Sequence, residues 1–185
     1  GMTRDVPDWV AAARTGWSHT GRSRPEFAEA PGPGQESVWD YPRPPIIVPD
    51  VRRVVVGPDD DAPIADTTAS VRVLETASPP TFYLPPGDVD RDRLVPADGS
   101  SFCEWKGPAR YWADRARPDE PIGWEYPSPF DDFAALAGFL SFYPARVRCL
   151  VDGEVVRPQA GGFYGGWVTD EIVGPFKGEP GTQGW

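Results

Sequence analysis

Hydrophobic and polar positions along the chain alternate in short runs, which is the pattern of β-strands. In the segment SVRVLET, Val71 and Val73 fall on one face of an extended strand, and Arg72 and Leu74 fall on the other. This alternation predicts a half-buried strand. Further strands are predicted for apolar runs between turn residues, namely VRRVVV (51–56), IAD (64–66), TFYL (81–84), FCEWK (102–106), ARYWADR (109–115) and VRCLVDGEVVR (147–157).

The residues between these strands predict two hairpins and one edge strand. Asp152–Gly153 is the favoured two-residue hairpin turn and splits the segment 147–157 into two strands. Gly107–Pro108 is predicted to join FCEWK to ARYWADR in the same way. Prolines flank TFYL, and because proline cannot donate a ladder hydrogen bond, this segment is expected at a sheet edge.

Two segments have helical patterns. A short helix is predicted from Trp9 to Arg14, with Asp8 as its cap. The second helix is predicted in SPFDDFAALAGFLSFYP, after Ser128–Pro129 and before Pro144. Its apolar face would consist of Phe133, Leu136, Ala137 and Leu140, at positions i, i+3, i+4 and i+7.

Together these elements predict a mostly-β fold: a strongly bent antiparallel sheet, or a small β-tent or barrel-like domain, with one short helix packed on it. The 24 prolines and 20 glycines fit short strands with many turns, and the 23 aromatic residues supply a core. We expect an N-terminal arm over residues 1–35, a core over 36–160 and an irregular C-terminal arm over 161–185.

Charge and composition exclude several classes of function. The net charge of −10 argues against nucleic-acid binding and against an anionic membrane surface. His19 is the single histidine and there are two cysteines, too few for a conventional zinc site, so no metal or other cofactor is expected. No apolar run approaches a membrane span and no signal-peptide core is present, so a cytoplasmic location with reduced thiols is expected.

Five blocks carry a resemblance to a known family: RVLETASPPTFYLPPGDV, CEWKGPARYW, WEYPSPF, FYPARVRCLVDGE and GGFYGGWVTDEIVGPFKGEPGT. In this order they resemble the domain of unknown function 427, from about Glu36 to Trp185. The resemblance implies a mostly-β, tent-like or barrel-like domain. Some collections label this family as nucleotidyltransferases, but the resemblance implies a fold far better than a function.

Most of the compared positions match the pattern of that family, and one position departs from it. The positions that match it are Glu75, Tyr83, Cys103, Lys106 and Tyr111. Ser78 departs from it, because His or Arg is common there. If that basic side chain binds an anion in relatives, this chain lacks the contact or replaces it with an arginine.

Motifs of nucleotide enzymes are weak in this sequence. Neither G-x-x-x-x-G-K-[ST] nor G-x-G-x-x-G occurs, and GGFYGGW (161–167) is interpreted as close backbone packing beneath its aromatic residues. The carboxylates of DVDRDRL, at 88, 90 and 92, would share one face of a strand and suit a cation, but the preceding Pro-Pro-Gly favours a solvated turn or the start of a helix. The run DDD (59–61) is likewise interpreted as a solvated turn.

Glu75, Lys106 and Cys103 form the sharpest candidate set. If their strands were neighbours, Glu75 and Lys106 would meet across the sheet, as an acid-base pair in a cleft or as a structural salt bridge. Strand alternation separates Cys103 from Lys106, which argues against a thiolate beside the lysine. Five aromatic residues are expected either to line a ligand pocket or to belong to an aromatic core: Tyr83, Tyr111, Trp112, Trp124 and Tyr126.

Three functions are compatible with these residues. The first is a small-molecule binding module with a pocket bordered by Glu75, Tyr83, Lys106 and Tyr111. The second is an enzyme acting on a nucleotide or another phosphorylated metabolite, with Glu75, Lys106 and Cys103 as the candidate catalytic groups. The third is a structural or protein-interaction domain. The sequence favours the first, because no motif rises to a catalytic signature.

Overall fold

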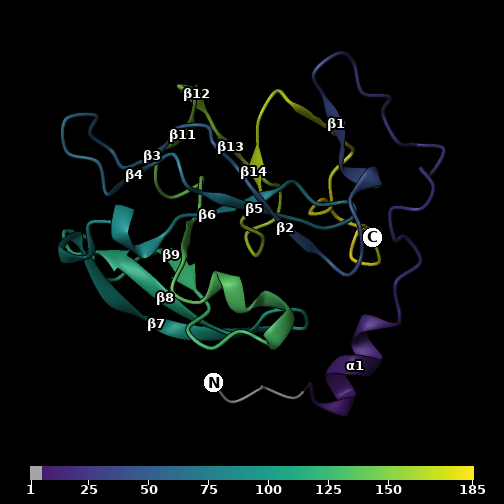
Figure 1. Ribbon diagram of the computed structural model, residues 1–185, viewed down its shortest axis with the longest axis horizontal. Coiled ribbons are helices and arrows are strands. Elements are labelled where there is room, and N and C mark those ends of the chain that lie inside the picture. Colours follow the sequence, from purple (N-terminus) through teal and green to yellow (C-terminus); the bar gives the residue numbers. More distant parts are fainter. Residues whose placement is uncertain (1–5) are drawn as a thin grey trace.

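Short antiparallel strands dominate the fold, as the sequence predicts, and they form several separate sheets (Figure 1). The structure is a computed structural model that describes residues 6–185. The mostly-β prediction is confirmed, and within those residues the strands form several sheets that do not close into a barrel. Most strands have two to five residues, whereas β7 (Leu94–Cys103), with ten residues, continues through Pro96 and Gly99, and its pairing with β8 (Gly107–Asp114) shifts register between Ala97 and Ser100.

Two sheets face the interior of the molecule from opposite sides. One sheet has the order β10-β9-β8-β7, and the other has the order β2-β5-β6. The first consists of β7 (Leu94–Cys103), β8 (Gly107–Asp114), β9 (Pro121–Glu125) and β10 (Leu140–Phe142). The second consists of β2 (Ile46–Pro49), β5 (Val71–Leu74) and β6 (Thr81–Tyr83), and β6 is an edge strand as predicted.

A third sheet and two strand pairs complete the β structure. The third sheet, in the order β12-β11-β3-β4, consists of β3 (Val54–Val56), β4 (Ala65–Thr67), β11 (Cys149–Val151) and β12 (Glu154–Val155). The pairs are β1 (Glu36–Ser37) with β15 (Ile172–Val173), which is parallel, and β13 (Arg157–Pro158) with β14 (Trp167–Val168).

The helical elements are short. They are α1 (Asp8–Arg14) and the 3-10 helices η1 (Val38–Asp40), η2 (Pro86–Asp88), η3 (Arg91–Arg93) and η4 (Asp131–Leu136). α1 confirms the first predicted helix, but Pro7 occupies the cap position and no described side chain caps the helix. Among residues 6–185, no helix has the length and apolar content needed to cross a bilayer.

The second predicted helix is mostly wrong. A 3-10 helix, η4, replaces its first half, and β10 replaces its second half. Gly138 separates the two with a φ of +80°, which glycine adopts without strain. Leu140 then pairs with Glu125 of β9, so the apolar spacing reflects burial in two different elements. Ala137, assigned to the buried face, is exposed.

The two predicted hairpins have different outcomes. In the β11–β12 hairpin, Asp152 and Gly153 have φ values of 46° and 82°, the left-handed conformations that a two-residue turn requires, so this prediction is confirmed. The β7–β8 hairpin turns at residues 104–106 instead of at Gly107–Pro108. Gly107, with a φ of +101°, pairs with Cys103 and starts the return strand directly after the turn.

Alternation along β5 separates two parts of the core. Val73 packs with aromatic residues of the β7–β10 sheet, whereas Leu74 packs with Trp39 and Ile172 on the other face. A third cluster lies around β3, β4 and β11, where Phe82 and Trp167 stack with ring centroids 4.9 Å apart.

The N-terminal arm contacts the C-terminal residue through an aromatic cluster. Phe27 stacks on Trp185 at 5.0 Å, and both rings contact Trp39 edge-on. The N-terminal arm also contacts the body at α1, where the rings of Trp9 and Phe102 lie 5.1 Å apart and Arg14 donates to the backbone oxygen of Glu104 (Figure 1).

Candidate functional site

A cavity of about 460 Å³ lies between the β2-β5-β6 sheet and the β7–β8 hairpin. Its lining includes the site candidates Glu75, Tyr83, Cys103, Lys106 and Tyr111, and also Trp124 and Tyr126. Trp112, also expected in the pocket wall, does not line this cavity, and its Nε1 donates to Oε1 of Glu125 instead. The five site candidates come from the segment after β5, from β6, β7 and β8, and from the turn between β7 and β8. The tertiary structure thus brings together positions that lie far apart in the sequence.

Lys106 is buried at the end of the β7–β8 turn. Burial lowers the pKa of its ammonium group, but the neighbouring Cys103, Tyr83 and Glu75 raise that pKa, and the balance lies above the ordinary value. Within residues 6–185, no carboxylate lies within 4 Å of its Nζ. Lys106 is therefore a buried cation without an ion-pair partner in the described chain.

Cys103 and Lys106 lie closer together than strand alternation predicts. Residues 104–106 form a turn, so the alternation that would place these two side chains on opposite faces ends at Cys103. The thiol of Cys103 contacts the ammonium group of Lys106 and contributes to its raised pKa. Cys103 is partly exposed to the cavity, whereas Cys149 is buried in the core.

Glu75 forms its ion pair with Arg43, not with Lys106. β5 and β7 belong to different sheets, so the condition for a cross-strand pair is not met. Oε2 of Glu75 accepts a hydrogen bond from Nε of Arg43 at 3.1 Å. The same guanidinium group donates to the backbone oxygens of His19 and Thr76, at 2.9 and 3.0 Å, and is only 2% exposed.

Lys177 is a site residue that the sequence reasoning did not single out. It comes from the C-terminal segment, and its Nζ lies 4.4 Å from the ring centroid of Trp17 and 5.7 Å from that of Tyr164. Burial lowers the pKa of Lys177, nearby Arg43 lowers it further, and Glu75 and Glu104 oppose the shift. A signal was present, because lysine is rare among the 18 basic residues of this chain.

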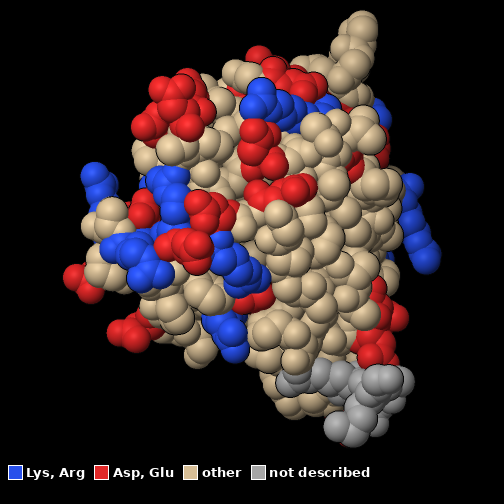
Figure 2. Space-filling view, turned by 60° about the vertical axis from the view of Figure 1, so that its left-hand side comes forward, with Lys and Arg blue, Asp and Glu red and all other residues tan. Residues whose placement is uncertain are grey.

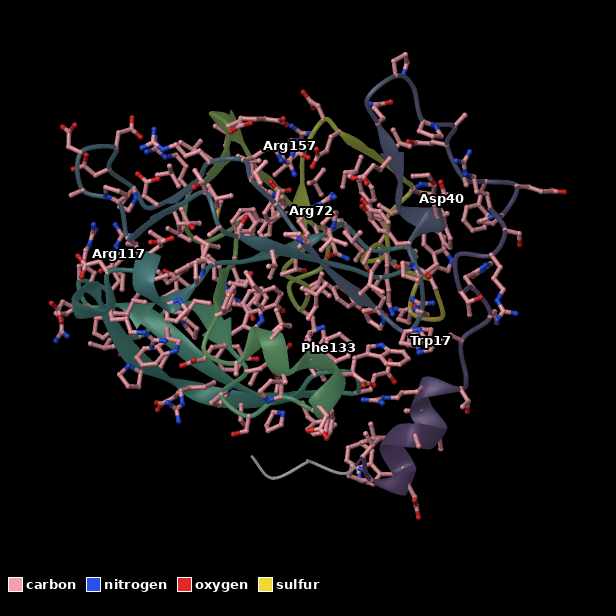
Figure 3. All side chains as sticks on the ribbon, in the orientation of Figure 1. Trp17, Asp40, Arg72, Arg117, Phe133 and Arg157 are labelled. Atoms are coloured by element: carbon pink, nitrogen blue, oxygen red, sulfur yellow. The ribbon has the colours of Figure 1, made fainter. Side chains whose placement is uncertain are left out.

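Glu104 and Trp17 form the edge of the cavity nearest the N-terminal arm. Nε1 of Trp17, which follows α1 in the arm, donates to Oε1 of Glu104 at 3.1 Å (Figure 3). Burial raises the pKa of Glu104, and Glu75 adds to the rise, while the Trp17 hydrogen bond and the cations Lys177 and Arg43 lower it. The net result is a carboxyl group whose pKa lies above its ordinary value.

Aromatic rings make up much of the remaining wall. Nε1 of Trp124 donates to the hydroxyl of Tyr83 at 3.3 Å, and the Tyr111 hydroxyl donates to Oγ of Ser101 at 2.7 Å. Burial raises the pKa of Tyr83 and of Tyr126, so both phenols are protonated at neutral pH and present O–H groups. The wall therefore offers flat apolar faces with a few polar atoms.

The glycine-rich loop at 161–167 closes another side. A Cβ on Gly165 would lie 2.3 Å from the ring of Trp124, and one on Gly166 would lie 2.3 Å from Oε1 of Gln159. The prediction of close backbone packing is confirmed at these two glycines. Phe163 is 76% exposed, however, so it does not cover the loop.

The acidic run at 59–61 lies in a turn, as predicted, whereas Asp88 and Asp92 lie in the 3-10 helices η2 and η3. Asp88 accepts a hydrogen bond from Thr67 at 2.6 Å, Asp90 accepts one from the backbone of Asp92 at 3.2 Å, and Asp59 accepts one from the backbone of Asp61 at 3.0 Å. In the described part of the chain, no three His, Cys, Asp or Glu side chains gather as metal ligands would.

Comparison with known proteins identifies the family of the chain. The family model for the domain of unknown function DUF427 matches residues 46–153, which is more than half of the chain. This region contains the five candidate residues, whereas Trp17 and Lys177 lie outside it. No curated protein matches the chain. The protein therefore belongs to the DUF427 family.

Proposed function

We propose that the protein binds a small molecule with an anionic group in the cavity between the two sheets. The observation that carries this proposal is the position of the two lysines. In a chain of net charge −10, both of them, Lys106 and Lys177, line the same aromatic cavity. Neither ammonium group has a carboxylate within 4 Å in residues 6–185, and burial lowers the pKa of Lys177, so its positive charge is only partly compensated by the chain.

The carboxylates in the lining have partners of their own. Glu75 is held by the buried guanidinium group of Arg43, and Glu104 is held by the indole of Trp17. The charge of Arg43 neutralises that of Glu75. The two lysines of the cavity are then balanced by only one carboxylate, that of Glu104. A ligand carboxylate or phosphate would supply the missing negative charge.

The volume of the cavity and the residues of its wall indicate the size and the apolar character of the ligand. A volume of about 460 Å³ falls within the range of about 300–1,000 Å³ for small-molecule sites. Trp124 and Trp17 contribute to the cavity wall, against which a planar or apolar ligand body would pack. We infer a metabolite of up to nucleotide size with one anionic end.

A ligand panel tests this proposal through thermal stability. The panel comprises nucleotides with and without magnesium, sugar phosphates and aromatic or aliphatic organic acids. A ligand at about 100 times its dissociation constant adds about 2.7 kcal/mol of stability, or about 5–10 °C in Tm. The shift should be lost in Lys106→Met and Lys177→Met and retained in Arg110→Met, which removes an exposed cation from β8.

A shift that survives both lysine substitutions would contradict the proposed site. A flat panel would contradict ligand binding and favour a protein-interaction domain. Both cysteines are free thiols, which supports a cytoplasmic location as part of the proposal.

An enzyme acting on a nucleotide or a phosphorylated metabolite is the second candidate, and the name of the matching family model refers to nucleotide transfer. Glu104 and Lys177 favour it, because the pKa of the acid is raised and that of the base is lowered at one cavity edge. Turnover that falls in Glu104→Gln while ligand binding is retained would support it, and turnover unchanged by that substitution would contradict it.

A further inference from the structure

We propose that the protein has a second binding site, for an oligophosphate anion, in an arginine-lined cavity separate from the first. This cavity has a volume of about 700 Å³ and lies among η3, the loop that follows β8 and the loop that precedes β11. Among the described residues, it shares no lining residue with the first cavity. Five arginines line it: Arg93, Arg115, Arg117, Arg146 and Arg148.

The arginines gather on one side of an acidic protein. Arg117 lies at the side of the molecule shown on the left in Figure 3. With that side turned forward, blue side chains are concentrated on it, with red ones among them (Figure 2). Three carboxylates, Asp92, Asp114 and Glu120, share the cavity, so its lining has two more positive than negative charges. The whole chain has a net charge of −10.

An ion-pair network does not account for this cluster. None of the three lining carboxylates lies within 4 Å of an arginine nitrogen in residues 6–185. Oδ1 of Asp114 instead accepts a hydrogen bond from the backbone of Ala116 at 2.9 Å. Within the described chain, Arg148 alone among the five forms an ion pair, with Asp60 of the loop between β3 and β4.

Neutral acceptors hold three of the guanidinium groups in place. Arg115 donates to the backbone oxygen of Asp92 at 2.8 Å, and Arg146 donates to that of Pro121 at 2.7 Å. Arg93 donates to the backbone oxygen of Ala62. A guanidinium group has five N–H donors, so one such bond fixes its position and leaves its charge and other donors available.

Donors of two further arginines lack a hydrogen-bond partner within the described chain. Nε of Arg148 is buried and has no hydrogen-bond partner there. The side chain of Arg117 makes no hydrogen bond or ion pair with residues 6–185. Arg117 is exposed at a cavity whose other cations are already oriented, the arrangement expected of a site that waits for an anion, whereas Nε of Arg148 is shielded and out of an anion's reach.

The remaining lining indicates the class of anion. Pro58, Ala116, Ile122 and Val147 supply the apolar part, and none of the described aromatic rings lines this cavity, so a base would find no ring on which to stack. Recognition would therefore rest on charge and bidentate hydrogen bonds. Five guanidinium groups exceed what one phosphate group engages, so we assign a pyrophosphate unit, free or as part of a larger molecule.

Calorimetric titration of the full chain with inorganic pyrophosphate tests the assignment. Arg117→Ala is the informative variant, because this side chain has no partner in the described chain whose loss would affect folding. We expect its dissociation constant to rise about ten- to a hundredfold, the equivalent of one charge-assisted hydrogen-bonded contact, with Tm unchanged. Arg22→Ala, which removes an exposed arginine from the N-terminal arm, should bind as the unmodified chain does.

Other outcomes decide against the site. Failure of pyrophosphate to bind at millimolar concentration would overturn it. Binding that is lost in Lys177→Met and retained in Arg117→Ala would place the anion in the first cavity and also overturn it. A DNA oligonucleotide that binds through Arg117 while pyrophosphate does not would replace the proposal with a nucleic-acid site.

Equal affinity for pyrophosphate and a nucleoside diphosphate would support the proposal, because it would show that the site recognises the phosphates alone.

Discussion

The indole nitrogen of Trp17 donates a hydrogen bond to the carboxylate of Glu104 at 3.1 Å, across 87 positions of sequence. This bond ties the N-terminal arm to the β7–β8 turn that carries Lys106. The ring of Trp17 also lies 4.0 Å from the guanidinium carbon of Arg43 and 4.4 Å from Nζ of Lys177. One arm residue thus contacts three charged groups at the edge of the first cavity.

Replacing Trp17 with Phe should raise the pKa of Glu104. The indole N–H stabilises the charged carboxylate, so its loss favours the protonated form, while a phenyl ring retains a face for the cation of Arg43. An NMR titration of the glutamate side chains measures the shift. A pKa of Glu104 that is unchanged or falls would show that the hydrogen bond does not persist in solution.

Glu104→Gln should stabilise the protein at neutral pH. The pKa of Glu104 in the folded chain lies above its ordinary value of 4.5, so the folded chain binds more protons than the unfolded chain as the pH rises past 4.5. Stability contributed by this group therefore falls with rising pH, and glutamine removes that loss. Urea unfolding should show a gain for the variant that shrinks as the pH is lowered toward 4.5. A difference independent of pH would contradict the shift.

Arg43→Met and Lys106→Met should differ in their effects on stability. Removal of Arg43 leaves Glu75 without its partner and two backbone oxygens without a donor, so we expect a loss of about 3–5 kcal/mol. Lys106 has no ion pair to lose within the described chain, only the weaker interactions with Cys103, Tyr83 and Glu75 that raise its pKa, so Lys106→Met should lower the free energy of unfolding by less than Arg43→Met does. Denaturant unfolding of both variants measures this contrast. Equal losses would identify Lys106 as a structural residue.

Gly165→Ala and Gly162→Ala provide a matched pair within one loop. An added methyl at 165 would collide with the Trp124 ring, and overpacking of this kind costs about 1–3 kcal/mol. An added methyl at 162 meets no described atom within 4 Å, so that variant should be neutral. Because Trp124 lines the first cavity, Gly165→Ala should also weaken ligand binding there. Equal behaviour of the two variants in thermal unfolding would contradict the close approach.

Alkylation should distinguish the two cysteines. Burial raises the pKa of the Cys149 thiol and removes it from solvent, whereas Cys103 is partly exposed in the lining of the first cavity. Iodoacetamide should therefore modify Cys103 first, and a ligand of the first cavity should slow that reaction. Mass spectrometry of the native protein identifies the modified thiol. Prior modification of Cys149 would contradict this arrangement of the core.

Local patterns predicted local elements well where few conformations compete. The Asp152–Gly153 turn and the alternation along β5 follow from backbone preference and a period of two, which act between neighbouring residues. The prediction of a helix over the segment 128–144 was wrong, because apolar residues spaced by three and four positions indicate which residues are buried and do not by themselves indicate a helix. Gly138 and the pairing of Leu140 with Glu125 decided its conformation.

The amino-acid sequence alone predicted the class of fold, the family, and five candidate residues that share one cavity. It could not predict which charged groups contact each other, because those contacts depend on how the sheets assemble. Glu75 pairs with Arg43 and not with Lys106, because β5, which precedes Glu75, and β7, which precedes the turn with Lys106, belong to different sheets. Lys177 lines the same cavity although it lies outside the residues that the family model matches. Turn and strand preferences act over a few residues, whereas a charge interacts with whatever the fold brings close to it, wherever that group lies in the sequence.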